Sequence, residues 1–293
     1  DQIDIKEALA ILSELFCDPS VLKIGHNIKY DAQVLENYGI QIKSYDDSML
    51  LSYVLDCGSH PHNLDDLCKL HLDHKNIKFK EVVGTGKTQL SFDRVALDKA
   101  LDYAAEDADM TLRLHALLKP KLIEKRLVTV YETLERPLID VLKTIERIGI
   151  KVDATKLKQL SDDFSLRLIN LEKEIQSLAG REFNVASPKQ LGEILFDELK
   201  LPGGKKGKTG AYGTGADVLD KLAEDGHAIP IKILKYRQLA KLKSTYTDSL
   251  IAQINPNTGR VHTSFSMAGT STGRLSSSDP NLQNIPIRTE EGR

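Results

Sequence analysis

The hydrophobic periodicity of the chain changes near residue 122, and this change limits the folds open to it more than any other feature. Residues 1–122 alternate short apolar runs with runs at helical spacing, which is typical of an α/β domain. Residues 123–254 keep helical spacing throughout, whereas residues 255–293 contain short alternating runs bounded by turns. In a chain of 293 residues we therefore expect an α/β domain, a helical domain and the first part of a third domain.

A carboxylate lies at the start of a helix that follows a predicted strand. Residues 21–25 form a short apolar run, and apolar residues recur at helical spacing over 28–38, up to Gly39. We expect Asn27 to cap this helix. Asp31 then lies in the first turns of a helix that leaves a sheet edge, where carboxylates often converge. A carboxylate that only interacts with the helix dipole is the alternative.

A second carboxylate lies on a predicted helix over residues 95–118. Tyr103 and Asp107 are one helical turn apart, so they share a face. Hydrolysis of a phosphodiester by two divalent ions needs several carboxylates. Asp31 and Asp107 are candidate ligands, and the Tyr103 hydroxyl could orient the attacking water. The alternative is two unrelated surface acids in a chain with 42 Asp and Glu residues.

Three other patterns in this region are interpreted as structural. The run at 83–88 lacks a P-loop, because Glu81 stands where that motif needs its first glycine. Cysteines and histidines crowd between residues 57 and 74, but neither a Cys-x-x-Cys pair nor zinc-finger spacing is present, so we do not favour zinc. Residues 45–47 are interpreted as a turn that caps a helix over 48–55.

The central region is predicted to be helical from its apolar spacing. Residues 134–148 form one apolar stripe that ends at Gly149, and residues 157–178 form a second, as in an antiparallel helical hairpin. On a later helix, over 231–246, Arg237 and Lys241 stand one turn apart. Such a basic stripe can contact DNA phosphates without reading sequence, and an ordinary solvated basic face is the alternative.

Polar hydrogen-bond donors concentrate near the end of the chain. A hairpin of 250–254 with 261–267 is expected to precede them. The donors are Arg274, Asn281, Gln283, Asn284 and Arg288. Acceptors line the minor groove of DNA at nearly every base pair, so arginine and amide side chains can hold that groove whatever the sequence. A solvated loop is the alternative.

Composition limits how the chain can bind partners. The formal charge of −2 is a poor match to a simple DNA coat, so affinity for nucleic acid must come from local patches. The three cysteines include no Cys-x-x-Cys pair, which fits a reducing cytosol. The sequence contains no apolar run of membrane-spanning length, so we expect no membrane partner.

Several of these segments resemble sequence motifs of known families. Thr-Gly-Arg-Leu-Ser-Ser at 272–277, followed by Asp-Pro-Asn-Leu-Gln-Asn-Ile-Pro at 279–286, resembles the start of the palm of family A DNA polymerases. Residues 236–246 resemble the thumb of that family. The stretch 24–31 resembles the second motif of DnaQ-like 3′–5′ exonucleases, and Tyr103-x-x-x-Asp107 resembles the third.

The resemblance implies a domain order. It predicts an RNase H-like (DnaQ-like) exonuclease domain at 1–122, a helical thumb at 123–254 and the first hairpin of an α+β palm at 255–293. The first exonuclease motif, Asp-x-Glu, and the palm aspartates do not occur in the chain. We therefore expect the exonuclease domain to lack its first strands, and the chain to be an inactive segment of a longer polymerase.

The resemblance also assigns roles to side chains. It makes Asp31 and Asp107 metal ligands, and it makes Tyr103 a catalytic residue. Asn27 and Tyr30 would contact a frayed single strand. Arg274 would reach the minor groove at the primer end. Further DNA contacts would come from Arg237, Lys241, Asn281, Gln283, Asn284 and Arg288.

The implied activity of the intact protein is template-directed transfer of deoxynucleotides with 3′–5′ proofreading. Its cofactor would be Mg²⁺, with Mn²⁺ or Zn²⁺ as alternatives. Its partners would be primer-template DNA, a single-stranded 3′ end and deoxynucleoside triphosphates, and it would act as a monomer in the bacterial cytoplasm, at the nucleoid. Two alternatives stay open: a free-standing DnaQ-like exonuclease, which would not need residues 272–286, and a catalytically inactive DNA-binding module.

Overall fold

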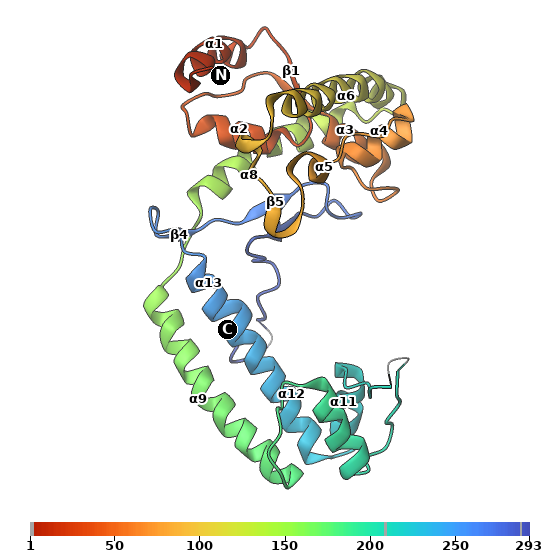
Figure 1. The fold of residues 1–293 in the computed structure, drawn as a ribbon, viewed down its shortest axis with the longest axis vertical. Coiled ribbons are helices and arrows are strands. Elements are labelled where there is room, and N and C mark those ends of the chain that lie inside the picture. Colours follow the sequence, from red (N-terminus) through yellow and green to blue (C-terminus); the bar gives the residue numbers. More distant parts are fainter. Residues whose placement is uncertain (1–2, 208–209, 288) are drawn as a thin grey trace. The chain divides into compact units, whose positions relative to one another are not determined.

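The computed structural model describes residues 3–207, 210–287 and 289–293, and in it the chain divides into two compact units (Figure 1). The first unit comprises residues 1–149 and 263–283, and the second comprises 150–262 and 284–293. Residues 136–148, which the sequence assigns to the thumb, therefore lie in the first unit. The predicted domain limits stay a prediction.

The first unit begins with helices around a small parallel sheet. Strand β1 (Lys23–Gly25) pairs in parallel with β2 (Tyr45–Asp47), with Lys23 opposite Tyr45 and Gly25 opposite Asp47. The surrounding helices are α1 (Ile5–Cys17), α2 (Ile28–Glu36) and α3 (Ser48–Asp56). The predicted succession of strand and helix is thus confirmed, except that residues 45–47 form a strand rather than a turn.

Further helices complete this unit. They are α4 (Leu64–Leu72), α5 (Phe79–Val83), α6 (Leu97–Glu124), α7 (Val128–Val130) and α8 (Arg136–Ile148), with short 3-10 turns at Gly86–Thr88 and Phe92–Arg94 and a π-helical turn at Tyr131–Glu135. The fully buried side chains come from α3, α4, α6, the π-helical turn and α8, and they include Leu50, Leu51, Leu67, Leu114, Leu118, Leu122, Tyr131 and Ile139.

Helix α8 does not bury the face that its sequence predicts. In the predicted stripe, Leu142 is buried, but Leu134, Val141, Ile145 and Ile148 are exposed. Lys143 and Glu146 are buried instead. Both have charged partners on α2, because Lys143 faces Glu36 at 3.8 Å and Glu146 pairs with Lys29. These ion pairs turn the polar side of α8 inward.

The hairpin predicted for 250–254 with 261–267 is confirmed only at its turn, where Asn255 and Arg260 form an antiparallel bridge, and its first strand is wrong. Residues Ser249–Ala252 form helix α13 and not a strand. Strand β4 (Arg260–Val261) pairs antiparallel with β3 (Ile150–Lys151), and β5 (Ser264–Ser266) pairs antiparallel with β6 (Ser276–Ser278). The first hairpin of the predicted palm is therefore β5–β6. A short apolar run such as 250–254 does not distinguish strand from helix, and here the preceding helix continues through it.

The second unit is helical. It contains α9 (Ala154–Ala179), α10 (Pro188–Gly192), α11 (Ala216–Glu224), α12 (Ala228–Lys241) and α13, with π-helical turns at Glu193–Glu198 and Leu242–Asp248. Helices α9 and α12 pack side by side (Figure 1). The sequence predicts instead a hairpin of the stripes at 134–148 and 157–178, but α8 belongs to the first unit and α9 to the second. One core cluster surrounds Ile175 and Ile233, and a second joins Phe164 to Leu239. No helix in the described part of the chain is long and apolar enough to cross a membrane.

Candidate functional site

The start of α2 is shaped by Asp47 rather than by Asn27. Asn27 stands at the N-cap position, as predicted, but it has a left-handed backbone (φ 61°) and its side chain makes no capping hydrogen bond. Instead, the Asp47 carboxylate accepts the N–H groups of Asn27 at 3.1 Å and Ile28 at 3.0 Å. It also accepts the N–H of Met49 at 2.9 Å, which confirms it as the cap of α3. Burial raises the pKa of Asp47 to about 6, although these amides favour its charged form.

Asp31 and Tyr30 follow on the first turn of α2. Tyr30 is 65% exposed, so its ring is free to meet a ligand. Both residues line a largely apolar pocket of about 470 Å³ that also includes Phe16 and Ile28. Desolvation raises the pKa of the Asp31 carboxyl above its usual range. The pocket is thus suited to a ligand with an aromatic or apolar face.

Tyr103 and Asp107 lie one turn apart on α6 and share a face of it, as predicted. The Tyr103 ring packs against Phe79 and Phe92, with ring centres 5.9 Å away in each case. Burial and the nearby Asp107 charge raise the pKa of Tyr103 to about 12, so the phenol stays protonated and can donate. Burial also raises the pKa of Asp107, helped by the charges of Glu106 and Asp65.

The residues present do not by themselves form a metal site. Across the described ranges, no group of three or more His, Cys, Asp or Glu side chains is arranged to hold a metal ion. The structure records no contact between Asp31 and Asp107. Hydrolysis with two metal ions needs more carboxylates than these two supply. We derive no step through a metal from this chain alone.

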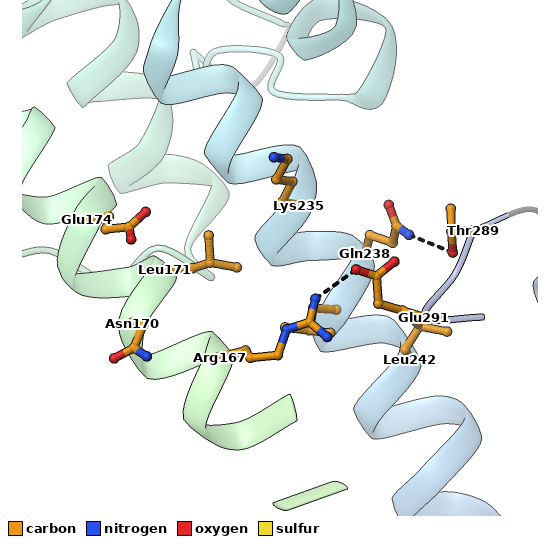
Figure 2. A pocket seen from close by; sticks show the side chains of 10 residues that line it. Arg167, Asn170, Leu171, Glu174, Lys235, Gln238, Leu242, Thr289 and Glu291 are labelled. Atoms are coloured by element: carbon orange, nitrogen blue, oxygen red, sulfur yellow. Dashed lines mark hydrogen bonds and ion pairs between the residues drawn. The ribbon is translucent and has the colours of Figure 1, made fainter. Parts of the chain in front are cut away.

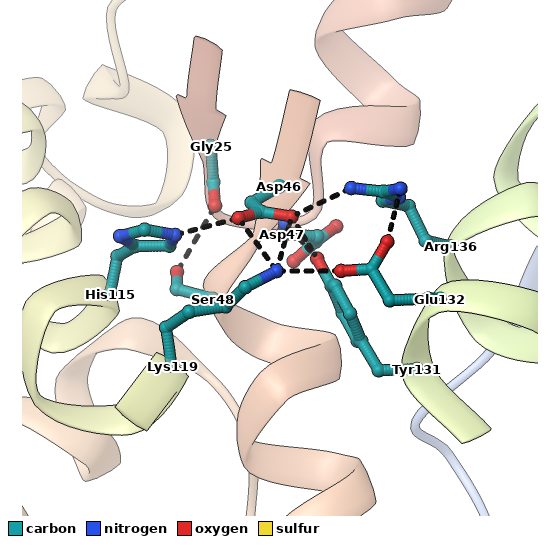
Figure 3. A network of polar contacts seen from close by, with 9 residues as sticks. All are labelled: Gly25, Asp46, Asp47, Ser48, His115, Lys119, Tyr131, Glu132 and Arg136. Atoms are coloured by element: carbon teal, nitrogen blue, oxygen red, sulfur yellow. Dashed lines mark hydrogen bonds and ion pairs between the residues drawn. The ribbon is translucent and has the colours of Figure 1, made fainter. Parts of the chain in front are cut away.

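Sequence reasoning missed a buried network around Asp46 (Figure 3). This carboxylate accepts from Lys119 at 3.1 Å and from the Tyr131 hydroxyl at 3.1 Å. The His115 imidazole lies 2.8 Å away and Arg136 lies 3.3 Å away. Burial alone would raise the pKa of Asp46. The hydrogen bonds from His115, Lys119 and Tyr131 outweigh burial and hold the pKa below its usual range.

A second buried carboxylate links α8 to two other elements. Glu146 pairs with Lys29 on α2 and accepts from Gln33 Nε2 at 2.5 Å. It also accepts the backbone N–H of Phe265, on β5, at 2.7 Å. Lys29 lies on α2, two residues before Asp31. The Glu146 carboxylate therefore holds both the helix that carries Asp31 and the β5–β6 hairpin.

The predicted minor-groove donors differ in their availability. Arg274 is exposed, and its guanidinium makes no recorded bond to any residue that the structure describes. Gln283 is occupied, because its side chain accepts from Ser277 N at 3.0 Å and donates to Leu275 O at 2.9 Å. The Asn281 side chain accepts the N–H of Gln283 at 3.0 Å. Arg288 lies outside the described residues.

In the second unit, the predicted donors also differ in how accessible they are to a ligand. The Asn284 carbonyl accepts from the Tyr246 hydroxyl. The Arg237 guanidinium donates to the backbone oxygen of Thr214 at 2.5 Å and to its hydroxyl at 3.3 Å. Burial lowers the pKa of Arg237, whereas Lys241 is exposed. Arg237 therefore supports the loop before α11, and Lys241 is the more accessible cation.

A pocket of about 390 Å³ lies between α9, α12 and residues 289–291 (Figure 2). Arg167 on α9 pairs with Glu291 at 2.7 Å, and Gln238 on α12 donates to the Thr289 hydroxyl at 3.0 Å. These two contacts hold the end of the chain against the helices of its own unit.

Comparison with known proteins supports the resemblance. Residues 154–293 match the family described as DNA polymerase family A, and residues 1–123 match the family described as 3′–5′ exonuclease. The whole chain is 53% identical to DNA polymerase I of Rhizobium leguminosarum and 49% identical to that of Pseudomonas aeruginosa. It spans 29% and 32% of the length of those two curated relatives.

A solved structure is also similar over nearly the whole chain. It is the POL domain of Pol1 from M. smegmatis in complex with DNA primer-template and dNTP, with a TM-score of 0.81 at 31% identity. The match covers 99% of this chain and 47% of the other.

Proposed function

This chain belongs to DNA polymerase family A, and we propose that the protein containing it copies primed DNA and removes mismatched 3′ ends. The observation that carries the proposal is that relatives named DNA polymerase I match the chain over its entire length. The similar solved structure holds primer-template DNA and a nucleotide. A free-standing exonuclease would not require the polymerase-family match over 154–293.

We assign the two reactions to different parts of the chain. The region up to residue 122 would be an RNase H-like exonuclease domain, in which Asn27 and Tyr30 hold a single strand beside Asp31, Tyr103 and Asp107. A divalent ion, which we propose to be Mg²⁺, would supply the nucleophilic hydroxide when further ligands complete the site. The protein would act as a monomer in the cytoplasm, near the nucleoid.

Polymerase function depends on how the remaining residues hold duplex DNA. Arg274 is exposed on the turn before β6, so its guanidinium can donate to minor-groove acceptors at any base pair. Lys241 would contact phosphates on the thumb side. Asn281, Gln283, Asn284 and Arg288 would follow along the duplex, with Gln283 acting mainly by fixing the backbone that carries its neighbours.

The first test replaces Arg274 with alanine in the full-length protein. We expect kcat/KM for primer extension to fall about 10- to 100-fold, because a hydrogen bond to a charged group contributes about 1.5–3 kcal/mol. The matched control is Arg113→Ala, since Arg113 is exposed and pairs with its helix neighbour Asp109. Equal rates for the Arg274 and Arg113 variants would contradict the role of Arg274. The 293-residue chain alone is expected to give no template-directed product.

The second test replaces Asp31 with alanine in the same full-length protein. We expect digestion of single-stranded DNA in Mg²⁺ to fall by about 100-fold or more, because even loss of a partner that only orients a metal ligand lowers activity 10- to 100-fold. Primer extension should be unchanged. The control is Asp18→Ala, which removes a partly exposed carboxylate that hydrogen-bonds to nearby Ser20. Retention of exonuclease activity by the Asp31 variant would exclude Asp31 as a ligand.

A further inference from the structure

The turn that carries Arg274 is closed by the side chain of Thr270, its first residue. The Thr270 hydroxyl donates to the carbonyl of Arg274 at 2.6 Å and accepts the N–H of Arg274 at 3.2 Å. Gly273 has a left-handed backbone (φ +73°). Glycine gives such a turn many accessible conformations. Contacts from other parts of the chain must therefore select the single conformation that the folded protein adopts.

These outside contacts come from the end of α3, about 217 residues earlier in the chain. The Tyr53 hydroxyl donates to the carbonyl of Thr270 at 2.9 Å. Cys57 Sγ lies 3.8 Å from the same carbonyl. Tyr53 therefore holds the turn at the residue whose hydroxyl closes it.

Tyr53 is itself rigidly placed. Its residue is 4% exposed, and its ring meets the His62 ring edge-on, with centres 5.4 Å apart. Gly58 also lies close to the turn, since a Cβ atom added at Gly58 would lie 2.6 Å from the Cβ of Ser271. The turn thus rests on a fixed support that belongs to the region matched to the 3′–5′ exonuclease family.

We propose that Tyr53 is a positioning residue for Arg274, so that the exonuclease region sets the geometry with which the polymerase grips the primer end. This inference rests on the proposed function, because it assumes that Arg274 contacts DNA. Tyr53 touches neither DNA nor substrate. It acts by holding the Thr270–Arg274 turn in the conformation that binds, so the turn need not be ordered when DNA arrives.

The test is a double-mutant cycle in the full-length polymerase with Tyr53→Phe, Arg274→Ala and both changes together. Phenylalanine keeps the buried ring and removes only the hydroxyl. We expect Tyr53→Phe to lower kcat/KM for primer extension about 3- to 10-fold, mainly through a higher KM for primer-template. In the Arg274→Ala background, Tyr53→Phe should have almost no further effect, because the guanidinium that it positions is gone.

Each outcome decides the matter. If the fold losses in kcat/KM of the two single changes multiply in the double variant, the inference is overturned. An unchanged KM for DNA in the Tyr53→Phe enzyme would overturn it as well. If Arg274→Ala itself leaves extension unchanged, the assigned DNA contact fails instead. Tyr38→Phe, at an exposed tyrosine, is the matched control, and digestion of single-stranded DNA at the normal rate verifies folding. If Tyr53→Phe cannot be purified folded, Gly58→Ala displaces the turn from the other side and should raise the same KM.

Discussion

Replacing Glu146 with alanine is expected to destabilise the first unit by about 3–5 kcal/mol, because it leaves the buried ammonium of Lys29 without its partner. The side chains of Lys29 and Glu146 are 7% and 5% exposed, so water cannot replace the lost carboxylate. The backbone N–H of Phe265 and the amide of Gln33 lose an acceptor as well. Urea unfolding of the chain, followed by circular dichroism, measures the change.

Further variants separate the cost of an unpaired buried charge from the cost of lost packing. The double change Lys29→Met and Glu146→Leu should recover part of the stability, because replacing both members of a buried pair with apolar groups is often neutral or favourable. Recovery stays incomplete because the donors on Gln33 and Phe265 remain unpaired. The control Asp109→Ala breaks an exposed pair with Arg113 and should cost less than about 1 kcal/mol. A similar small loss in Glu146→Ala would contradict the buried-charge argument.

Features that depend on neighbours within one helical turn could be predicted from the sequence. Asp153 caps α9 by accepting the N–H of Lys156, and Asn63 caps α4 by accepting that of Asp66. The shared face of Tyr103 and Asp107 is a further case. Such contacts depend only on helix geometry and residue type, and both are visible in a sequence.

Features that join distant segments could not be predicted in this way. Glu146 meets Lys29 across 117 positions, and no local pattern marks these two charges as buried partners. The inward polar side of α8 follows from that pairing. The pairing of β5 with β6 is a second example, because the serine-rich strand β6 lacks the apolar alternation that identifies a strand in a sequence.

The same distinction applies to the candidate site. Composition shows that residues 274–284 are rich in donors, but only the fold shows which donors are already used. Gln283 is occupied by Ser277 and Leu275, whereas Arg274 is exposed and its guanidinium has no recorded partner among the described residues. Arg237 looks equivalent to Lys241 in the sequence, yet it is committed to Thr214. A donor-rich sequence therefore predicts a binding surface better than it predicts the residues that bind.

The Asp46 network leads to a prediction that depends on pH. Asp46→Asn is expected to destabilise the chain by about 3–5 kcal/mol at pH 7, because it removes the charge that Lys119 and Arg136 share. The pKa of Asp46 in the folded state is below its ordinary value of 3.8. Its stabilisation is therefore fully present above pH 3.8 and is lost as the pH falls through the folded pKa.

The difference in unfolding free energy between the wild-type chain and Asp46→Asn isolates this carboxylate from all the others. It should shrink as the pH falls below about 4, since the protonated wild-type residue then resembles asparagine in charge. The control Asp56→Asn breaks a half-exposed pair with Lys125 and should cost less than about 1 kcal/mol. A difference for Asp46→Asn that stays constant down to pH 2 would show that its carboxylate acts through shape rather than through charge.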